Sequence, residues 1–229
     1  MSRKSKHTKN AARVLRKRLT PDVRAEQILR GAIRFFAERG FSGQTRELAN
    51  DLGISNGLLY RYFPNKEALI DSVYQEVFLR PWSPTWQAVL TDRNRTLIER
   101  LKIFYVDYSK LPLDYEWGRI YLYAALAGAS INRRYIKLVT ERIYKLVINE
   151  LRHEFGFHPI EQCEITEPET ELMWSLHGSI YYIGIRKWAY HVKGPSDIAG
   201  AIDQLVERFY GNAKTVMHAA LSRDKTLED

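Results

Sequence analysis

The stretch 55-SNGLLYRYFPNKEALI-70 contains a helical pattern of barely two turns, which ends at Pro64 and is followed at once by another helical pattern. Isolated helices shorter than about 12 residues are marginal in water, so neighbouring helices must hold this one in place. A helical wheel separates it into an apolar side and a polar side. The apolar side holds Leu58, Leu59, Tyr62 and Phe63, and the polar side holds Asn56, Gly57, Tyr60 and Arg61. The short helix is therefore predicted to be amphipathic, with a free polar face.

Two helices are predicted before this stretch. The first follows Thr20 and ends at Gly40, and a short second one spans about residues 45–52. Gly53 then permits a sharp turn, and the Ser55 hydroxyl can cap the next helix. Two short helices joined by a glycine-containing turn are typical of a helix-turn-helix, whose second helix enters the major groove of DNA.

The positive charge of the chain is concentrated at its start. The formal charge is +8 over 229 residues; residues 1–18 hold eight bases and no acid, residues 19–66 carry +2 and the remainder −2. This distribution indicates that an anionic polymer meets the N-terminal end, and residues 1–18 are expected to add phosphate or minor-groove contacts. The alternative is a solvated tail that binds nothing.

The composition favours a globular protein outside the membrane. No apolar run approaches the roughly 20 residues that span a bilayer, and no apolar segment follows the basic N-terminus. The single cysteine, Cys163, cannot form an internal disulfide. A cytoplasmic location with no membrane contact is expected.

Apolar residues recur at helical spacing almost throughout, which predicts an all-α fold. We expect a disordered basic arm (1–19), a helix-turn-helix DNA-binding domain (20–66), a connector helix (67–80) and a helical ligand-binding and dimerisation domain (81–229). In the last region the pattern predicts helices near residues 95–110, 113–130, 134–155, 167–191 and 196–221.

The segments 28-ILRGAIRFFAERGF-41 and 45-TRELANDLGISNGLLYRYFPNKEAL-69 resemble the DNA-binding domain of the TetR family of bacterial transcriptional regulators. The resemblance covers about residues 24–72. The link from Gly40 to Leu48 is one residue shorter than usual, and Tyr62 replaces the commoner His.

The resemblance implies a DNA-contacting role for nine positions. Three at the start of the second helix would touch phosphates or a guanine, three would face bases, two would reach the backbone and one would bind a phosphate. The residues at the start of the second helix are Gln44, Thr45 and Arg46, and those that would face bases are Asn56, Gly57 and Leu58. Tyr60 and Tyr62 would reach the backbone, and Lys66 would bind a phosphate. The alternatives are a solvated Arg46, a Tyr60 packed on the first helix, a core Leu58 and an ordinary surface Lys66.

Aromatic residues cluster in the second region, where they could line a ligand pocket between helices or simply form core. The pocket candidates are Phe104, Tyr105, Tyr108, Trp117, Tyr121, Trp174, His177 and Tyr181.

The last two helices carry long apolar stripes. These stripes include Met173, Leu176, Ile180, Ile183 and Gly184 in one helix and Ile198, Ile202, Leu205, Phe209, Val216 and Met217 in the other. The resemblance implies that the pair forms a four-helix homodimer interface, and a two-fold dimer would recognise a pseudo-palindromic operator. The alternative is burial of the stripes within one chain.

No HExxH, CxxC or paired-carboxylate pattern appears, so neither an enzyme nor a metal or other cofactor is expected. The sequence therefore predicts a homodimeric repressor that binds double-stranded operator DNA and responds to an unknown small-molecule effector. An architectural DNA-binding protein without an effector is the alternative.

Overall fold

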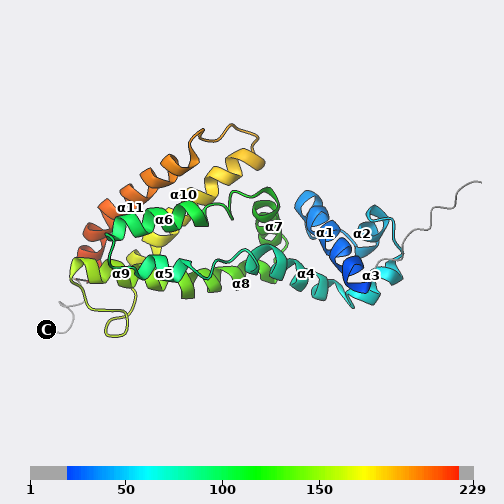
Figure 1. Ribbon diagram of the computed structural model, residues 1–229, viewed down its shortest axis with the longest axis horizontal. Helices are drawn as coiled ribbons and strands as arrows, with labels where there is room; N and C mark the ends of the chain where they lie inside the picture. Colours follow the sequence, from blue (N-terminus) through cyan, green and yellow to red (C-terminus); the bar gives the residue numbers. More distant parts are fainter. Residues whose placement is uncertain (1–19, 222–229) are drawn as a thin grey trace, which may run out of the picture.

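The computed structural model describes residues 20–221, and within that range every regular element is helical (Figure 1). The all-α prediction is confirmed. The predicted basic arm lies outside the described residues. The elements are α1 (Pro21–Arg39), α2 (Thr45–Asp51), α3 (Asn56–Tyr62), α4 (Lys66–Tyr74), η1 (Gln75–Leu79), α5 (Trp86–Thr91), α6 (Leu97–Tyr108), α7 (Tyr115–Leu126), α8 (Ser130–Val139), η2 (Thr140–Tyr144), α9 (Lys145–Phe155), α10 (Glu167–Trp188) and α11 (Ile198–Leu221).

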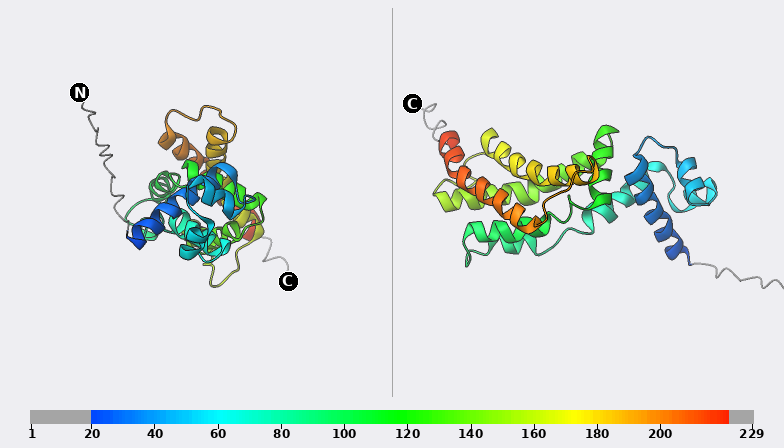
Figure 2. Two further views of the ribbon diagram at one scale, coloured as in Figure 1. Left: turned by 90° about the vertical axis from the view of Figure 1, so that its right-hand side faces the viewer. Right: turned by 90° about the horizontal axis from the view of Figure 1, so that it is seen from above.

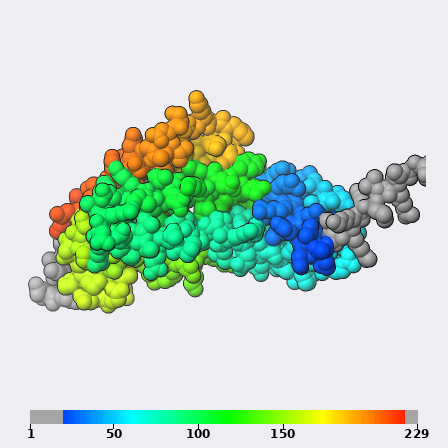
Figure 3. Space-filling model, in the orientation of Figure 1, coloured from blue at the N-terminus to red at the C-terminus, as the bar shows by residue number. Residues whose placement is uncertain are grey.

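The molecule is elongated, with α1–α3 at one end and α5–α11 forming a larger helical body (Figures 1 and 2). The connector α4 leads from the small group into the body. Helix α1 packs against α4 and also against α7 of the body. In the space-filling view the residues of α1–α3 lie at one end of the described chain (Figure 3). The predicted domain boundaries remain predictions.

Two helices contain a turn of π-helix. The connector continues through η1, where the Arg80 amide bonds to the Gln75 carbonyl five residues back at 2.8 Å. The predicted helix over 134–155 begins earlier, at Ser130, and passes through η2, where the Lys145 amide bonds to the Thr140 carbonyl. A five-residue hydrogen-bonded step encloses one residue more than an α-helical step, and such turns are frequent at functional sites.

Most residues of the apolar stripes of the last two helices are buried within one chain, whereas Ile198, Leu205 and Val216 are half-buried; the homodimer interface stays a prediction. Met173, Ile180, Ile202 and Met217 are fully buried within one chain. The reason is that α11 packs against both α10 and α6, so the stripes are covered by intrachain contacts. The alternative of burial within one chain therefore holds for these residues.

A buried ion pair ties the end of α9 to the start of α10. The Arg152 guanidinium and the Glu169 carboxylate are both fully buried, and they form two hydrogen bonds of 2.7 and 2.6 Å. Arg152 also donates to the carbonyls of Cys163 at 2.6 Å and Glu164 at 2.8 Å. Glu169 accepts from the Thr166 amide in a capping box. One guanidinium thus fixes the loop between the two helices.

Candidate nucleic-acid interface and effector cavity

The turn between α2 and α3 forms for local reasons. Gly53 has a φ of 62°, in the left-handed region that favours glycine. The Ser55 hydroxyl accepts from the Leu58 amide at 3.1 Å and so caps α3, which confirms the predicted cap. Leu59 and Phe63 bury the inner side of α3. The short helix is therefore held by its cap and by its buried side, and its outer side is left free.

A hydrogen bond joins the first residue of α2 to the outer side of α3. The Thr45 and Tyr60 hydroxyls lie 2.7 Å apart, so the structure brings together two residues predicted to contact DNA. Tyr60 is 38% exposed and is not packed away on α1. The bond fixes the start of α2 relative to the face that α3 presents.

Lys66 also has a defined position. Its ammonium donates to the Phe41 carbonyl at 2.6 Å and to the Gly43 carbonyl at 3.2 Å, in the loop before α2. Lys66 is half-buried, so it is not an ordinary surface lysine. Its contact with a DNA phosphate remains a prediction. Its two hydrogen bonds hold the start of α4 against the loop that leads into α2.

The outer face of this unit is polar and cationic. Gln44, Arg46 and Gly57 are exposed, whereas Asn56, Leu58 and Tyr62 are half-buried. Arg46 has no ion-pair partner within residues 20–221, so its charge is available to an anion.

Arg61 belongs to the same face but was not among the predicted contacts. It is exposed, lies beside the Tyr62 ring at 5.9 Å, and likewise lacks an acidic partner in the described chain. Its position on the polar side of the helical wheel could have identified it as a candidate DNA contact.

Gly57 is exposed at the first turn of α3, and a Cβ added there would meet no atom of the described chain within 4 Å. Packing inside the protein therefore does not require a glycine at this position. Close approach of an external surface would require one.

The body holds a small cavity whose walls are mainly aromatic. Its volume is about 120 Å³, and α6, α7, α8, η2 and α10 contribute to it. Six predicted pocket residues line it, namely Tyr108, Trp117, Tyr121, Trp174, His177 and Tyr181. Phe104 and Tyr105 do not line it, which corrects the prediction for these two. They are buried in the core, where their rings pack on each other at 4.8 Å.

The sequence reasoning missed other wall residues, among them Tyr135 from α8 and Tyr144 from η2. Both are aromatic residues on predicted helices, which was a usable signal. Tyr135 and Tyr144 line the same cavity because of the way α8 and η2 pack against α7 and α10. The periodicity of the sequence does not predict that packing.

The ionisable groups that line the cavity are uncharged at neutral pH. Burial lowers the pKa of His177 to about 3, although its hydrogen bond to the Met173 carbonyl opposes the shift. Burial raises the pKa of the tyrosines above the ordinary value, and those affected are Tyr108, Tyr121, Tyr135, Tyr144 and Tyr181.

Two connections run from the cavity wall to the α1–α4 unit. The Phe78 ring of η1 is fully buried and lies 5.0 Å from Trp117 and 5.4 Å from Tyr135. On another side of α7, Arg119 donates to the Ala37 carbonyl of α1 at 2.6 Å. Helix α7 thus contacts the cavity and the end of α1 together.

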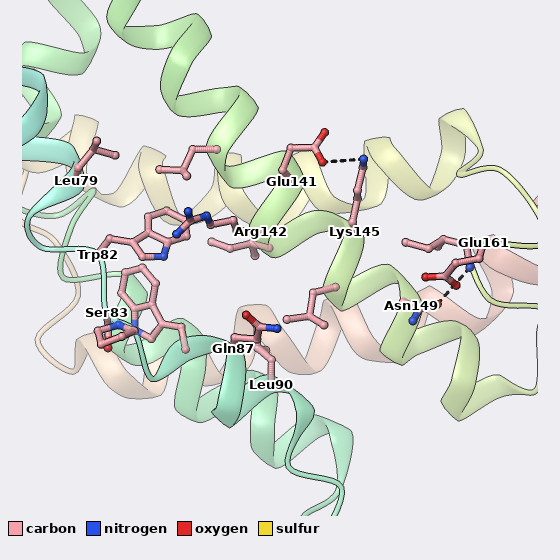
Figure 4. A pocket seen from close by; sticks show the side chains of 16 residues that line it. Leu79, Trp82, Ser83, Gln87, Leu90, Glu141, Arg142, Lys145, Asn149 and Glu161 are labelled. Atoms are coloured by element: carbon pink, nitrogen blue, oxygen red, sulfur yellow. Dashed lines mark hydrogen bonds and ion pairs between the residues drawn. The ribbon is translucent and has the colours of Figure 1, made fainter. Parts of the chain in front are cut away.

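A larger hollow of about 1000 Å³ opens beside α5, η2 and α9 (Figure 4). Apolar, polar and charged side chains all line it. Arg142 extends toward Trp82, whereas Glu141 and Lys145 pair with each other at 2.8 Å. The η2 turn separates the two hollows, because Thr140 and Tyr144 line the aromatic cavity while its other residues line the larger hollow.

The described range, residues 20–221, contains no group of three or more His, Cys, Asp or Glu side chains placed to hold a metal ion. No helix in this range has the length and apolar content needed to cross a membrane.

Comparisons with known proteins agree with the geometry of the N-terminal unit. Residues 28–73 match the sequence profile described as "Bacterial regulatory proteins, tetR family". A 46-residue segment is 46% identical to the Uncharacterized HTH-type transcriptional regulator YerO of Bacillus subtilis (strain 168). That segment is 20% of this chain and spans 16% of the length of the relative.

Solved structures of two regulators share the fold over most of the chain. A TetR-like transcriptional regulator from Rhodococcus sp. RHA1 has a TM-score of 0.59 at 19% identity, covering 86% of this chain and 98% of its own. A TetR family protein from Vibrio parahaemolyticus has a TM-score of 0.56 at 20% identity, covering 82% and 96%. Residues 28–73 therefore carry a DNA-binding domain of the tetR family of bacterial regulatory proteins, and most of the chain shares the fold of these two regulators.

Proposed function

We propose that the protein is a sequence-specific DNA-binding transcriptional regulator that acts as a ligand-responsive homodimeric repressor. The observation that carries this proposal is the free face of α3, held by the Ser55 cap and by the bond from Thr45 to Tyr60. Arg46 and Arg61 supply cations at that face that have no acidic partner among residues 20–221. Helix α3 would enter the major groove, with the start of α2 on the phosphates. Action on a bacterial chromosome would place the protein in the cytoplasm.

The response to a ligand is proposed to run through the aromatic cavity. A ligand shifts an equilibrium only when it binds one state better than the other. Trp117 and Tyr135 form cavity wall and also contact Phe78, at the end of the connector. A ligand that changes the packing of these rings would therefore bias the position of α4 and, with it, of α3.

The homodimer is proposed to form through the outward sides of α10 and α11, because their inward stripes are covered within the chain. Trp174 is 39% exposed and Tyr182 is 50% exposed on α10, with the exposed Gly178 between them at four-residue spacing. Two-fold pairing there would give two α3 helices, which would read half-sites about one DNA turn apart.

The proposal is tested by selecting bound fragments from a randomised duplex pool with the full chain, followed by affinity measurements at several salt concentrations. An enriched pseudo-palindrome bound at least about 10³-fold more tightly than random DNA would support a dimeric regulator. Tight binding to all fragments with a strong salt dependence and no enrichment would favour the alternative, an architectural DNA-binding protein.

Gly57→Ala should change stability and DNA affinity in opposite directions. The free energy of unfolding should rise by about 0.5–1 kcal/mol, because alanine favours a helix and the added Cβ meets nothing. Affinity for the selected operator should fall about ten-fold or more, because the methyl group would stand between α3 and the base edges. Urea unfolding and fluorescence anisotropy measure the two effects.

A matched control is Gly194→Ala in the loop between α10 and α11, where an added Cβ also meets nothing. Its operator affinity should equal that of the original protein. If Gly57→Ala binds operator as tightly as the control does, DNA does not approach this side of α3.

A further inference from the structure

Two residues that line the aromatic cavity carry buried polar groups without hydrogen-bond partners, and a third such group belongs to a residue packed behind one of them. Within the described chain, His177 Nε2, Trp117 Nε1 and Tyr105 Oη have no such partner. His177 and Trp117 line the cavity, and Tyr105 packs against the His177 ring at 5.3 Å. Buried polar groups are almost always paired, so this concentration indicates that something else pairs with them.

The hydrogen bonding of His177 defines what Nε2 requires. Its Nδ1 lies 3.2 Å from the Met173 carbonyl, which can only accept, so Nδ1 carries the proton. In the neutral ring Nε2 is then a bare acceptor, on the part of the ring that points away from the α10 backbone. Trp117 Nε1 is a donor only. An occupant that satisfies both must offer one donor and one acceptor, and a hydroxyl group offers both.

The walls exclude a charged occupant. No Asp, Glu, Lys or Arg is among the residues that line the cavity, so a buried carboxylate or ammonium would lack a counter-ion. Aromatic faces do attract cations. A quaternary ammonium, however, has no donor for His177 Nε2 and no acceptor for Trp117 Nε1.

The size and the walls indicate a single aromatic ring. The volume is about 120 Å³, and an apolar cavity of roughly 150 Å³ takes up benzene. Trp117 and Tyr121 are stacked at 5.0 Å, and Tyr135 and Tyr181 meet Tyr121 edge-on.

We infer that this cavity binds a small neutral aromatic molecule bearing a hydroxyl or N–H group, of the chemical class of the phenols. Its ring would lie among the tyrosine and tryptophan rings, and its hydroxyl or N–H group would donate to His177 Nε2. That this molecule acts as the effector rests on the proposed function; its binding does not.

The test is calorimetric titration of the full chain with four probes of similar size: phenol, anisole, toluene and the trimethylanilinium cation. Phenol should bind about ten-fold more tightly than anisole, which lacks the donor, and than toluene, which lacks both groups. Trimethylanilinium should bind more weakly than phenol. Equal affinities for phenol and toluene, or tightest binding of the cation, would overturn the inference.

Two variants locate the site. His177→Phe keeps an aromatic ring and removes the acceptor, so phenol should lose its advantage over toluene. The control, Gln87→Ala, alters the larger hollow from the α5 side and should leave phenol binding unchanged. The comparison of probes on the original protein decides the inference even if His177→Phe fails to fold.

Operator binding separates the two proposals. An enriched operator together with failure of all four probes to bind up to millimolar concentration would reject the ligand class and leave the regulator standing. Donor-dependent phenol binding without any operator would support the cavity assignment and reject the proposed function.

Discussion

Arg152→Met is expected to lower the free energy of unfolding by about 3–5 kcal/mol, because it leaves the fully buried Glu169 carboxylate without its cation. The loop carbonyls of Cys163 and Glu164 would also lose their donor. Methionine fills a similar volume, so the loss reports the missing charge and hydrogen bonds more than an empty space. Urea unfolding at pH 7 measures it.

The loss should depend on pH. Burial alone would raise the pKa of Glu169, but its hydrogen bonds with Arg152 and Thr166 outweigh burial and hold the pKa below the usual 4.5. In the original protein this carboxylate therefore stabilises the fold above about pH 4.5, and that contribution is lost as the pH falls through the lowered pKa. Without Arg152, burial raises the pKa of Glu169, and protonation relieves the uncompensated charge. The difference between the two proteins should be largest at pH 7 and shrink toward pH 4.

A suitable control is Lys102→Met, which removes an ion pair with Glu207 at the surface. Exposed pairs contribute about 0–1 kcal/mol, so its loss should be small. A cost for Arg152→Met no greater than that of the control would show that water or a rearranged loop compensates Glu169.

Phe78→Ala is expected to cost about 3–5 kcal/mol in the free energy of unfolding. Phe78 is fully buried and lies within 5.7 Å, centroid to centroid, of the Tyr74, Trp117 and Tyr135 rings. Its removal opens a space at the junction of the connector and the body. Thermal or urea unfolding measures the cost.

The milder Phe78→Leu tests the proposed coupling in a protein that stays folded. Its stability cost should be about 1–2 kcal/mol, because apolar volume is largely kept while ring contacts are lost. Operator affinity without ligand should stay close to that of the original protein, since Phe78 contributes nothing to the face of α3. The fold-change in operator affinity caused by a bound ligand should shrink toward one, because the contact from cavity wall to connector is weakened.

Phe209→Leu is the matched control for this variant. Phe209 is also a buried ring of the body, on α11, and within the described chain it makes no ring contact with Phe78 or with a residue that lines the cavity. It should lose similar stability and keep the ligand effect. Equal ligand effects in the two variants would exclude Phe78 as the route.

Local signals explain which parts of the fold could be predicted. Ser55 caps α3 as expected, and Asn65 caps α4 in the same way, since a cap depends on residues three positions apart. Helix α5 was missed because it has only six residues and no side-chain cap. Its position depends on a tertiary contact, the bond of 2.8 Å from Trp86 Nε1 to Asp107 of α6.

In the candidate site, too, local features could be predicted from the sequence and tertiary contacts could not. The polar side of α3 follows from its periodicity, but the bonds of Tyr60 to Thr45 and of Lys66 to Phe41 join residues 15 and 25 positions apart. Periodicity also shows that a side of α10 and α11 is buried without showing which partner buries it. The partners here are in the same chain.

The π turn at Thr140–Tyr144 has a consequence for how chains related to this one can differ in length. Because its five-residue step encloses one residue more than an α-helical step, one residue could be lost there while the helix on either side keeps its axis and phase. Differences in length between related chains should then occur inside this helix as well as in loops. Thr140 and Tyr144 line the aromatic cavity, so a single insertion or deletion there would exchange a wall side chain. The shape of the proposed ligand cavity would then change in one evolutionary step, without any change in α2 or α3.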